Sequence, residues 1–368
     1  MIIRRRQRPV VATRTMARRK RRRRALTALG AVSALVAGTA YGAWRYIDEN
    51  EYLLDERCEV SIGGTEHRLS PEQAHNAATI AAAAVDRGLP PEAAVHTIGI
   101  ALQESDLVVR ESEDERDARV LFARGTPSWS DGPNAQSVAI SLEGFYDVLE
   151  SSWQEALETD QDEENDDDVA SEEEESSKPP AWDPSMDLEE AAEALGRPQD
   201  PSFYPRHYER ARAFALPLAG QEQATMFCRL SQDETKVPAP NPEGVSDEIA
   251  AMLPHALQMP FTEPEEGEES EEESSESEEF APEPITDGII TVEGEGSEAV
   301  MTIAVPERDG EYDYLWMLGH WSVATAYDYG IESVLAGPYR WERDSGLWVR
   351  GQGHSDDAVV LRFGPDED

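Results

Sequence analysis

The sequence predicts a mainly helical domain over residues 58 to 230, then a small α+β domain over residues 285 to 368, behind a single N-terminal transmembrane helix. An uncharged apolar run near the N-terminus has the length of a membrane span. Apolar residues recur at helical spacing through the first domain. In the second domain, segments with strand and helix patterns follow one another, as in α+β proteins.

The N-terminus combines a basic tail with the apolar run. Residues 1 to 24 hold twelve of the chain's 32 Lys and Arg residues and no Asp or Glu. Residues 25 to 44, "ALTALGAVSALVAGTAYGAW", are uncharged and long enough to cross a bilayer. A signal peptide has a shorter apolar region and a small-residue cleavage site, so we favour a retained anchor. The basic tail then lies in the cytoplasm and the rest of the chain outside the cell.

The chain after the tail is strongly acidic. Subtracting the twelve positive charges of the tail from the net charge of −44 leaves −56. Because such a surface repels nucleic acid, we expect no nucleic-acid partner. A metal-transport role would rest only on the acidic tracts, and one span cannot form an alternating-access pathway alone.

Two acidic low-complexity runs divide the exported chain. Residues 160 to 178 are expected to form a disordered insert in the helical domain. Residues 263 to 284 belong to a Pro-rich and acidic linker over 231 to 284, in which "SDEIAAMLPHALQM" predicts a short helix. The runs lack the Gly turn and spaced ligands of a calcium loop.

Several segments of the first domain predict helices. "SPEQAHNAATIAAAAVDRG" has Ser70 as N-cap, Pro71 in its first turn and Gly88 after its end. "PPEAAVHTIGIALQES" and "DPSFYPRHYERARAFALPLAG" have apolar residues at helical spacing. "SLEGFYDVLESSWQEAL" and "MDLEEAAEALGRP" flank the first acidic run and read as amphipathic helices. No strand pattern stands out in this domain.

The second domain begins with a predicted hairpin around Gly296, in "GIITVEGEGSEAVMTIAV". "YLWMLGHWSVATAYDYG" predicts a helix ended by Gly330. "IESVLAGPYRWERDSGLWVR" and "DAVVLRF" predict further strands.

The two cysteines, Cys58 and Cys228, lie on the expected oxidising side of the membrane, where pairing is the default. A disulfide would connect the two ends of the helical domain and stabilise it by about 3 to 5 kcal/mol on the chain-entropy model. The alternative is two unrelated free thiols.

The stretch "ALQESDL", residues 101 to 107, places Glu104 at the end of an apolar helix. The C-terminal end of a helix disfavours an ionised carboxylate. Partial burial would further favour the protonated form that a general acid needs. The alternative is a solvated charge at the end of a helix.

These motifs resemble the lysozyme-like fold of lytic transglycosylases and goose-type lysozymes. More closely, they resemble a group of membrane-anchored actinobacterial proteins with such a domain, whose helix reads A-x-A-M-Q-E-S-x-L. Matches to that group's later motifs follow in order: "FYDVL" at 145 to 149, "AAEALGRPQDPSFYPRHY" at 191 to 208, "ARAFA" at 211 to 215 and the closing Cys228. The resemblance covers about residues 58 to 230.

The resemblance implies that Glu104 is the catalytic general acid/base of a peptidoglycan lytic transglycosylase or muramidase. The implied substrate-binding residues are Ser105, Phe122, Trp129 and Tyr146. A retaining hydrolase would need a second carboxylate, for which Asp106 and Asp131 are the candidates.

One stretch departs from the group's pattern. A G-L-F-Q-Q-R-P-S-x-G-W-G loop shapes the sugar site in that group, and residues 119 to 133, "RVLFARGTPSWSDGP", correspond to it here. The glycine has become Val120 and the first glutamine Ala123. The loop keeps apolar residues and loses polar ones, which favours a non-catalytic relative.

The second domain resembles a C-terminal domain common in actinobacterial wall proteins. Members related to metallo-peptidases end it in Asp-His-Val-His, whose two histidines can hold zinc. This chain has "GHSDDAVVLRF" instead, so we expect no metal site and no cofactor. We expect structural roles for His320 and His354, and a core built on Trp316, Trp321, Trp341 and Trp348.

Two functions follow from these interpretations. The first is an envelope-anchored cell-wall lytic enzyme that acts through Glu104. The second is a non-catalytic protein that binds peptidoglycan or an envelope protein. Both place the chain in the cell membrane as a single-pass protein with its C-terminal domains outside the cell.

Overall fold

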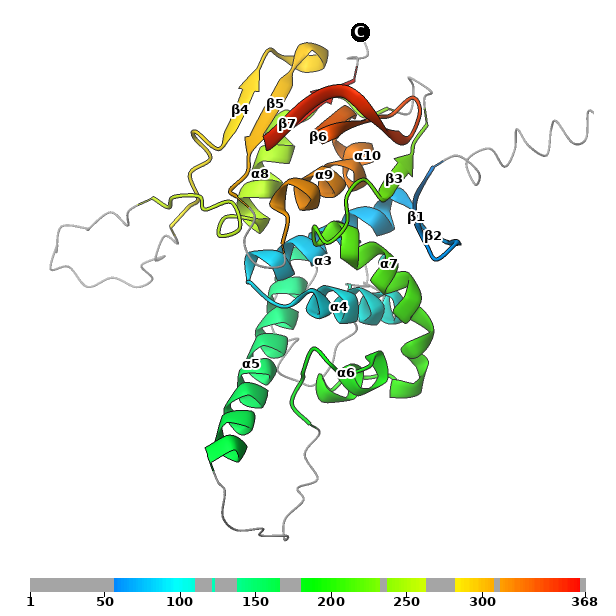
Figure 1. Cartoon of the computed structure of the whole chain (residues 1–368), viewed down its shortest axis with the longest axis vertical. Coiled ribbons are helices and arrows are strands. Elements are labelled where there is room, and N and C mark those ends of the chain that lie inside the picture. Colours follow the sequence, from blue (N-terminus) through cyan, green and yellow to red (C-terminus); the bar gives the residue numbers. More distant parts are fainter. Residues whose placement is uncertain are drawn as a thin grey trace, which may run out of the picture. The chain divides into compact units, whose positions relative to one another are not determined.

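The computed structural model describes residues 56–109, 121–122, 138–165, 180–231, 237–262, 282–307 and 312–364. Glu56–Asp368 forms one compact unit (Figure 1). The predicted basic tail and the predicted membrane span at 25 to 44 lie outside the described residues. Within the described part of the chain, no helix is both long and apolar enough to cross a bilayer.

The fold is mixed α/β with two antiparallel sheets, so the prediction of a mainly α domain was wrong. A three-stranded sheet, in the order β2-β1-β3, lies inside the predicted helical domain. Its strands are β1 (Arg57–Ile62), β2 (Thr65–Leu69) and β3 (Met226–Arg229). They have six, five and four residues, too few for an alternating pattern to stand out.

The disulfide predicted between Cys58 and Cys228 is confirmed. The two residues lie directly opposite each other on β1 and β3, with their Cα atoms 3.9 Å apart. The bridge joins positions 170 residues apart in the sequence. It therefore joins β1 and β3, the first and last strands of this sheet in sequence order. Several helices lie between these two strands in the sequence.

Two helices after β2 form as their sequences predict. Ser70 caps α3 (Pro71–Asp86), Gln73 completes a capping box, and Gly88 follows the helix with a φ of 65°. α4 (Pro91–Glu104) starts with Pro91 in its first turn.

Three further helices pack around α3 and α4. α7 (Tyr208–Leu218) packs against α4 and α3. α6 (Leu188–Ala194) packs on α4 at Gly99, where a Cβ atom would lie 2.6 Å from Leu188 Cδ2. α5 (Val138–Asn165) also packs on α3.

The first acidic run begins inside a helix, contrary to the prediction of a wholly disordered insert. α5 continues to Asn165, through the first six residues of the run at 160 to 178. Adding residues to an existing helix is easier than starting one, so the last turns of α5 need no apolar face of their own. Residues 166 to 178 lie outside the described residues.

The predicted C-terminal elements are present. The second sheet has the order β4-β5-β7-β6. Its strands are β4 (Ile290–Glu293), β5 (Val300–Ala304), β6 (Ile331–Glu342) and β7 (Leu347–Phe363). The 3-10 turn η4 (Gly296–Glu298) joins the predicted hairpin. The helices are α8 (Pro242–Met252), α9 (Tyr314–Ala324) and α10 (Ala326–Tyr329), the last ended by Gly330 in the left-handed region.

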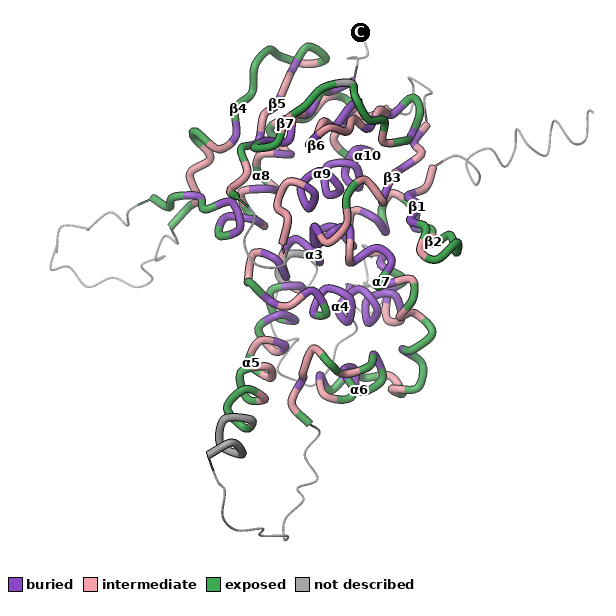
Figure 2. Tube along the Cα trace, in the orientation of Figure 1, coloured by how far each residue is buried: buried purple, intermediate pink, exposed green. Residues whose placement is uncertain are grey.

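Helix α9 lies at the centre of the core. It packs against β6 and β7 on one side and against α3 and α7 on the other (Figure 1). Nine of its eleven residues are buried, and Figure 2 shows it buried along its length. A helix that is apolar all round must be covered all round. Elements from both sides of the predicted linker therefore share one core.

Two tryptophans join the second sheet to β3. Trp341 on β6 and Trp348 on β7 are cross-strand partners. Trp341 Nε1 donates to the Cys228 carbonyl oxygen at 3.2 Å, and Trp348 Nε1 donates to the Met226 carbonyl oxygen at 2.7 Å. These bonds satisfy the indole donors of two large side chains at the junction of the two sheets.

A histidine pairs with two carboxylates where α3, α8 and α10 meet. His75 Nε2 lies 2.8 Å from Glu248 Oε1, and His75 Nδ1 lies 2.7 Å from Asp328 Oδ2. The Tyr329 hydroxyl also donates to Glu248. Burial alone lowers the pKa of His75, but its two carboxylate partners outweigh this and raise the pKa to about 9.

We expect the double variant Cys58→Ala/Cys228→Ala to lose about 3 to 5 kcal/mol of unfolding free energy, because the long loop between the cysteines is then unconstrained in the unfolded chain. Urea denaturation of both proteins measures the difference. Dithiothreitol should lower the midpoint of the wild type and leave that of the variant unchanged. Equal midpoints for the untreated proteins would contradict the expectation.

We expect the contribution of His75 to stability to be lost at alkaline pH. Because folding raises the pKa of His75, the contribution is fully present below about pH 6.5 and is lost as the pH rises through about 9. The free energy of unfolding of the wild type should therefore fall more across this interval than that of His75→Gln. Parallel pH profiles for the two proteins would show that His75 does not carry this dependence.

Candidate functional site

The carboxylate of Glu104 forms a buried ion pair with Arg197. Arg197 Nε donates to Glu104 Oε1 at 2.8 Å, and Arg197 Nη2 donates to Glu104 Oε2 at 2.6 Å. Both side chains are 0% exposed. Two parallel bonds of this kind are the strong, bidentate form of an arginine–carboxylate pair. The structure thus places Glu104 inside the protein, with both oxygens accepting hydrogen bonds.

Two aromatic residues also contact this pair. The Tyr204 hydroxyl donates to Glu104 Oε1 at 2.9 Å. Burial and the nearby Glu104 carboxylate raise the pKa of Tyr204, which keeps the hydroxyl protonated as a donor. The Arg197 guanidinium lies over the Phe145 ring, 5.5 Å from its centroid. Three of the matched motifs, at 101–107, 145–149 and 191–208, therefore meet at one buried ion pair.

The chain turns sharply after Glu104. Asp106 and Leu107 both have a φ of 56°, in the left-handed region that branched and bulky residues rarely adopt. α3 holds this turn: Gln73 Nε2 donates to the Asp106 carbonyl oxygen, and Asn76 Nδ2 donates to that of Leu107. Leu107 itself is fully buried. The turn fixes the end of α4, and with it the position of Glu104.

The residues predicted to bind substrate are in the core where the structure describes them. The Ser105 hydroxyl donates to the Ala101 carbonyl oxygen one turn back in α4. Phe122 is 2% exposed and stacks on Phe145, with ring centroids 4.3 Å apart. Tyr146 is fully buried and donates to the Ile80 carbonyl oxygen. Trp129, like most of the 119 to 133 loop, lies outside the described residues.

The candidate second carboxylates do not meet Glu104 in the described structure. Asp106 has an exposed side chain whose Oδ1 lies 3.9 Å from Arg210 Nη1. Asp131 lies outside the described residues. The catalytic role of Glu104 stays a prediction, and its observed partners are those of a structural ion pair.

The two C-terminal histidines have protein partners. His320 on α9 is fully buried and its Nδ1 lies 2.8 Å from the Pro217 carbonyl oxygen. Burial lowers the pKa of His320 to about 4, so it is neutral near pH 7. His354 is exposed and pairs with Asp356 at 2.7 Å. Among the residues that the structure describes, no three His, Cys, Asp or Glu side chains are grouped to hold a metal ion.

A polar surface lies beside the buried pair, and we call it the Gln103 surface. Gln103 precedes Glu104, and its side chain bonds with Gln199, Arg206 and His207. Phe203 is 50% exposed, the most exposed large apolar side chain in the described part of the chain. The Arg206 guanidinium lies over its ring. An exposed aromatic face bordered by amide and guanidinium groups offers both stacking and hydrogen bonds to a ligand.

Sequence reasoning missed Arg197 and Tyr204, the partners of Glu104. Each lies more than ninety residues from Glu104 in the sequence, so no local spacing joins them. One signal was present: Arg197 is a charged residue directly after Gly196, in a segment that otherwise reads as a helix end. A buried arginine requires an acidic partner, and Glu104 closes an apolar helix.

Comparisons of this chain with protein-family models, with curated proteins and with solved structures find no match.

We expect Glu104→Gln to lose about 3 to 5 kcal/mol of unfolding free energy, because it removes the bidentate carboxylate that neutralises the buried Arg197 cation. The double variant Glu104→Gln/Arg197→Met should lose clearly less, because it removes both charges. The control is Glu150→Gln, which breaks an exposed pair with Arg87 and should cost less than about 1 kcal/mol. Urea denaturation measures all three, and a Glu104→Gln loss no larger than that of Glu150→Gln would contradict the structural role.

Proposed function

We propose that this chain is a non-catalytic envelope protein that binds peptidoglycan. The observation that carries the proposal is the fully buried, bidentate pair of Glu104 with Arg197. A general acid must carry a proton and reach the glycosidic oxygen within about 3 Å. A carboxylate that accepts bonds from a guanidinium and a tyrosine, and whose side chain has no exposed surface, supports a structural role instead.

The binding part of the proposal rests on the resemblance of the motifs and on the Gln103 surface. Motifs of the lysozyme-like group are typical of proteins that act on peptidoglycan. Phe203 offers an apolar face for a sugar ring, and Gln103, Gln199 and Arg206 offer hydrogen-bonding groups beside it. The buried pair helps to fix the position of this surface, because Gln103 and Glu104 are neighbours on α4.

The proposal also places the chain after residue 45 outside the cell, attached to the membrane by an N-terminal anchor. The basic tail and the apolar run of residues 25 to 44 support this orientation. The disulfide between Cys58 and Cys228 supports it too, because such bonds persist in oxidising compartments. Peptidoglycan is the insoluble polymer that a protein anchored in this way would meet.

Incubating the purified full chain with purified cell wall tests the absence of catalysis. We expect no soluble muropeptides above the level released without protein, while an active muramidase serves as the positive control. Release by the wild type that disappears in a folded Glu104→Gln/Arg197→Met variant would overturn the proposal, because the activity would then depend on this ion pair.

Co-sedimentation with the same cell wall tests binding. We expect the wild type to pellet with the wall and Phe203→Ala to bind about fivefold more weakly, because an aromatic contact contributes about 1 kcal/mol. Leu347→Ala is the matched control, since Leu347 is also exposed but lies on the second sheet. Failure of the wild type to pellet would contradict peptidoglycan binding and favour an envelope protein as the partner.

A further inference from the structure

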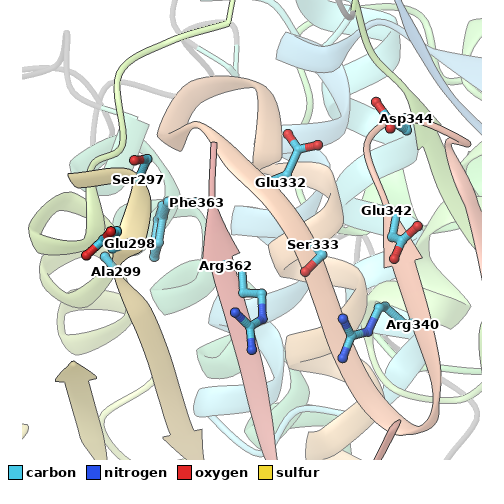
Figure 3. A pocket seen from close by; sticks show the side chains of 10 residues that line it. All are labelled: Ser297, Glu298, Ala299, Glu332, Ser333, Arg340, Glu342, Asp344, Arg362 and Phe363. Carbon is cyan, nitrogen blue, oxygen red and sulfur yellow. The ribbon is translucent and has the colours of Figure 1, made fainter. Parts of the chain in front are cut away.

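A hollow of about 370 Å³ lies where β6 bends back on itself, at the edge of the second sheet (Figure 3). The bend is fixed by a backbone bond from Arg343 N to the Glu332 carbonyl oxygen at 2.9 Å. Gly337 allows it with a φ of 53°, and the pairing with β7 shifts register on both sides of this glycine. Both halves of β6 therefore line the same hollow, together with the end of β7.

Two arginines line one end of the hollow. Figure 3 shows Arg362 of β7 and Arg340 of β6 on either side of Ser333. Neither arginine forms an ion pair with a carboxylate in the described part of the chain. Two guanidinium groups beside one hollow suit an oxyanion, which can accept hydrogen bonds from both.

Four acidic residues also line the hollow (Figure 3). Glu298 lies on the side formed by residues 297–299, and Glu332, Glu342 and Asp344 lie on the side of β6 and the turn after it. Burial raises the pKa of Glu332, and the like charges of Asp344 and Glu342 add to this against the opposing effect of Arg343. A cation beside these carboxylates would relieve their mutual repulsion. Glu332 Oε2 lies 3.6 Å from Arg343 Nε, but in the described part of the chain no ion pair joins these acids to Arg340 or Arg362.

We propose that the hollow binds a small zwitterion, a free amino acid or the ends of a short unblocked peptide. The carboxylate of the ligand pairs with Arg340 and Arg362, and its ammonium group lies against Glu332, Glu342 and Asp344. The Ser333 hydroxyl, between the two arginines, is placed to donate to the same carboxylate. A volume of about 370 Å³ is at the small end of ligand sites. This inference rests on the hollow alone and does not depend on peptidoglycan binding.

Calorimetric titration of the full chain at low ionic strength tests the proposal. The probes are alanine, alanylalanine and trialanine, each with a free ammonium and a free carboxylate. N-acetylalanine lacks the ammonium and alaninamide lacks the carboxylate, and we expect each to bind at least about tenfold more weakly than the best zwitterion. Tighter binding of alanine than of the peptides identifies a free amino acid as the ligand, and the reverse identifies a peptide.

Variants locate the site. Arg362→Gln and Arg340→Gln should each weaken binding of the best zwitterion about tenfold. Glu342→Gln should weaken binding of the zwitterion more than binding of N-acetylalanine, because N-acetylalanine has no ammonium group to lose a partner. The matched control is Arg350→Gln, since Arg350 is also an arginine of β7 but lies over the Tyr339 ring outside the hollow. Thermal unfolding of each variant verifies folding. Binding of no zwitterion at millimolar concentration, equal binding of N-acetylalanine, or an equal loss in Arg350→Gln would overturn the proposal.

Discussion

The all-round burial of α9 is the constraint on which the rest of the structure depends. Its sequence "YLWMLGHWSVA" has no polar face, so it is stable only with protein on every side. The second sheet covers one side and the helices α3 and α7 cover the other. The bond from His320 to the Pro217 carbonyl oxygen fixes this packing within an apolar environment. Two segments that differ in composition are thereby held as one unit.

The buried pair of Glu104 and Arg197 offers a structural explanation for a glutamate at the end of an apolar helix, a pattern that was related to catalysis from the sequence alone. A glutamate that closes an apolar helix can be a catalytic acid, but it can equally be the partner of a buried cation. Here three matched motifs converge on that pair through Phe145, Arg197 and Tyr204. Packing around one ion pair brings these motifs together, whatever the chain binds at its surface.

The sequence predicted the helix ends that are determined by residues next to them in the chain. Ser70 and Gly88 mark the ends of α3, and Gly330 ends α10 as expected. The β1–β2 hairpin was not predicted, although the pair Gly63-Gly64 is a common hairpin turn and both glycines have a positive φ. The strands beside this turn are too short to show an alternating pattern. Long-range features were beyond a local pattern. The pairing of β1 with β3, the partner of Glu104 and the folded-back β6 each join residues that only the tertiary fold brings together.

β1 is the central strand of its sheet, yet its partner β3 is made only after all the helices between them. α9, which covers α3 and α7, is made later still. During synthesis, a chain that has left the ribosome up to residue 230 therefore contains all strands of the first sheet and all of α3, α4 and α7. The apolar surface that α9 covers in the complete fold is still exposed to water. A chain cut at this point would keep its disulfide and still be prone to aggregate. The boundary suggested by composition is thus a poor place to divide this protein.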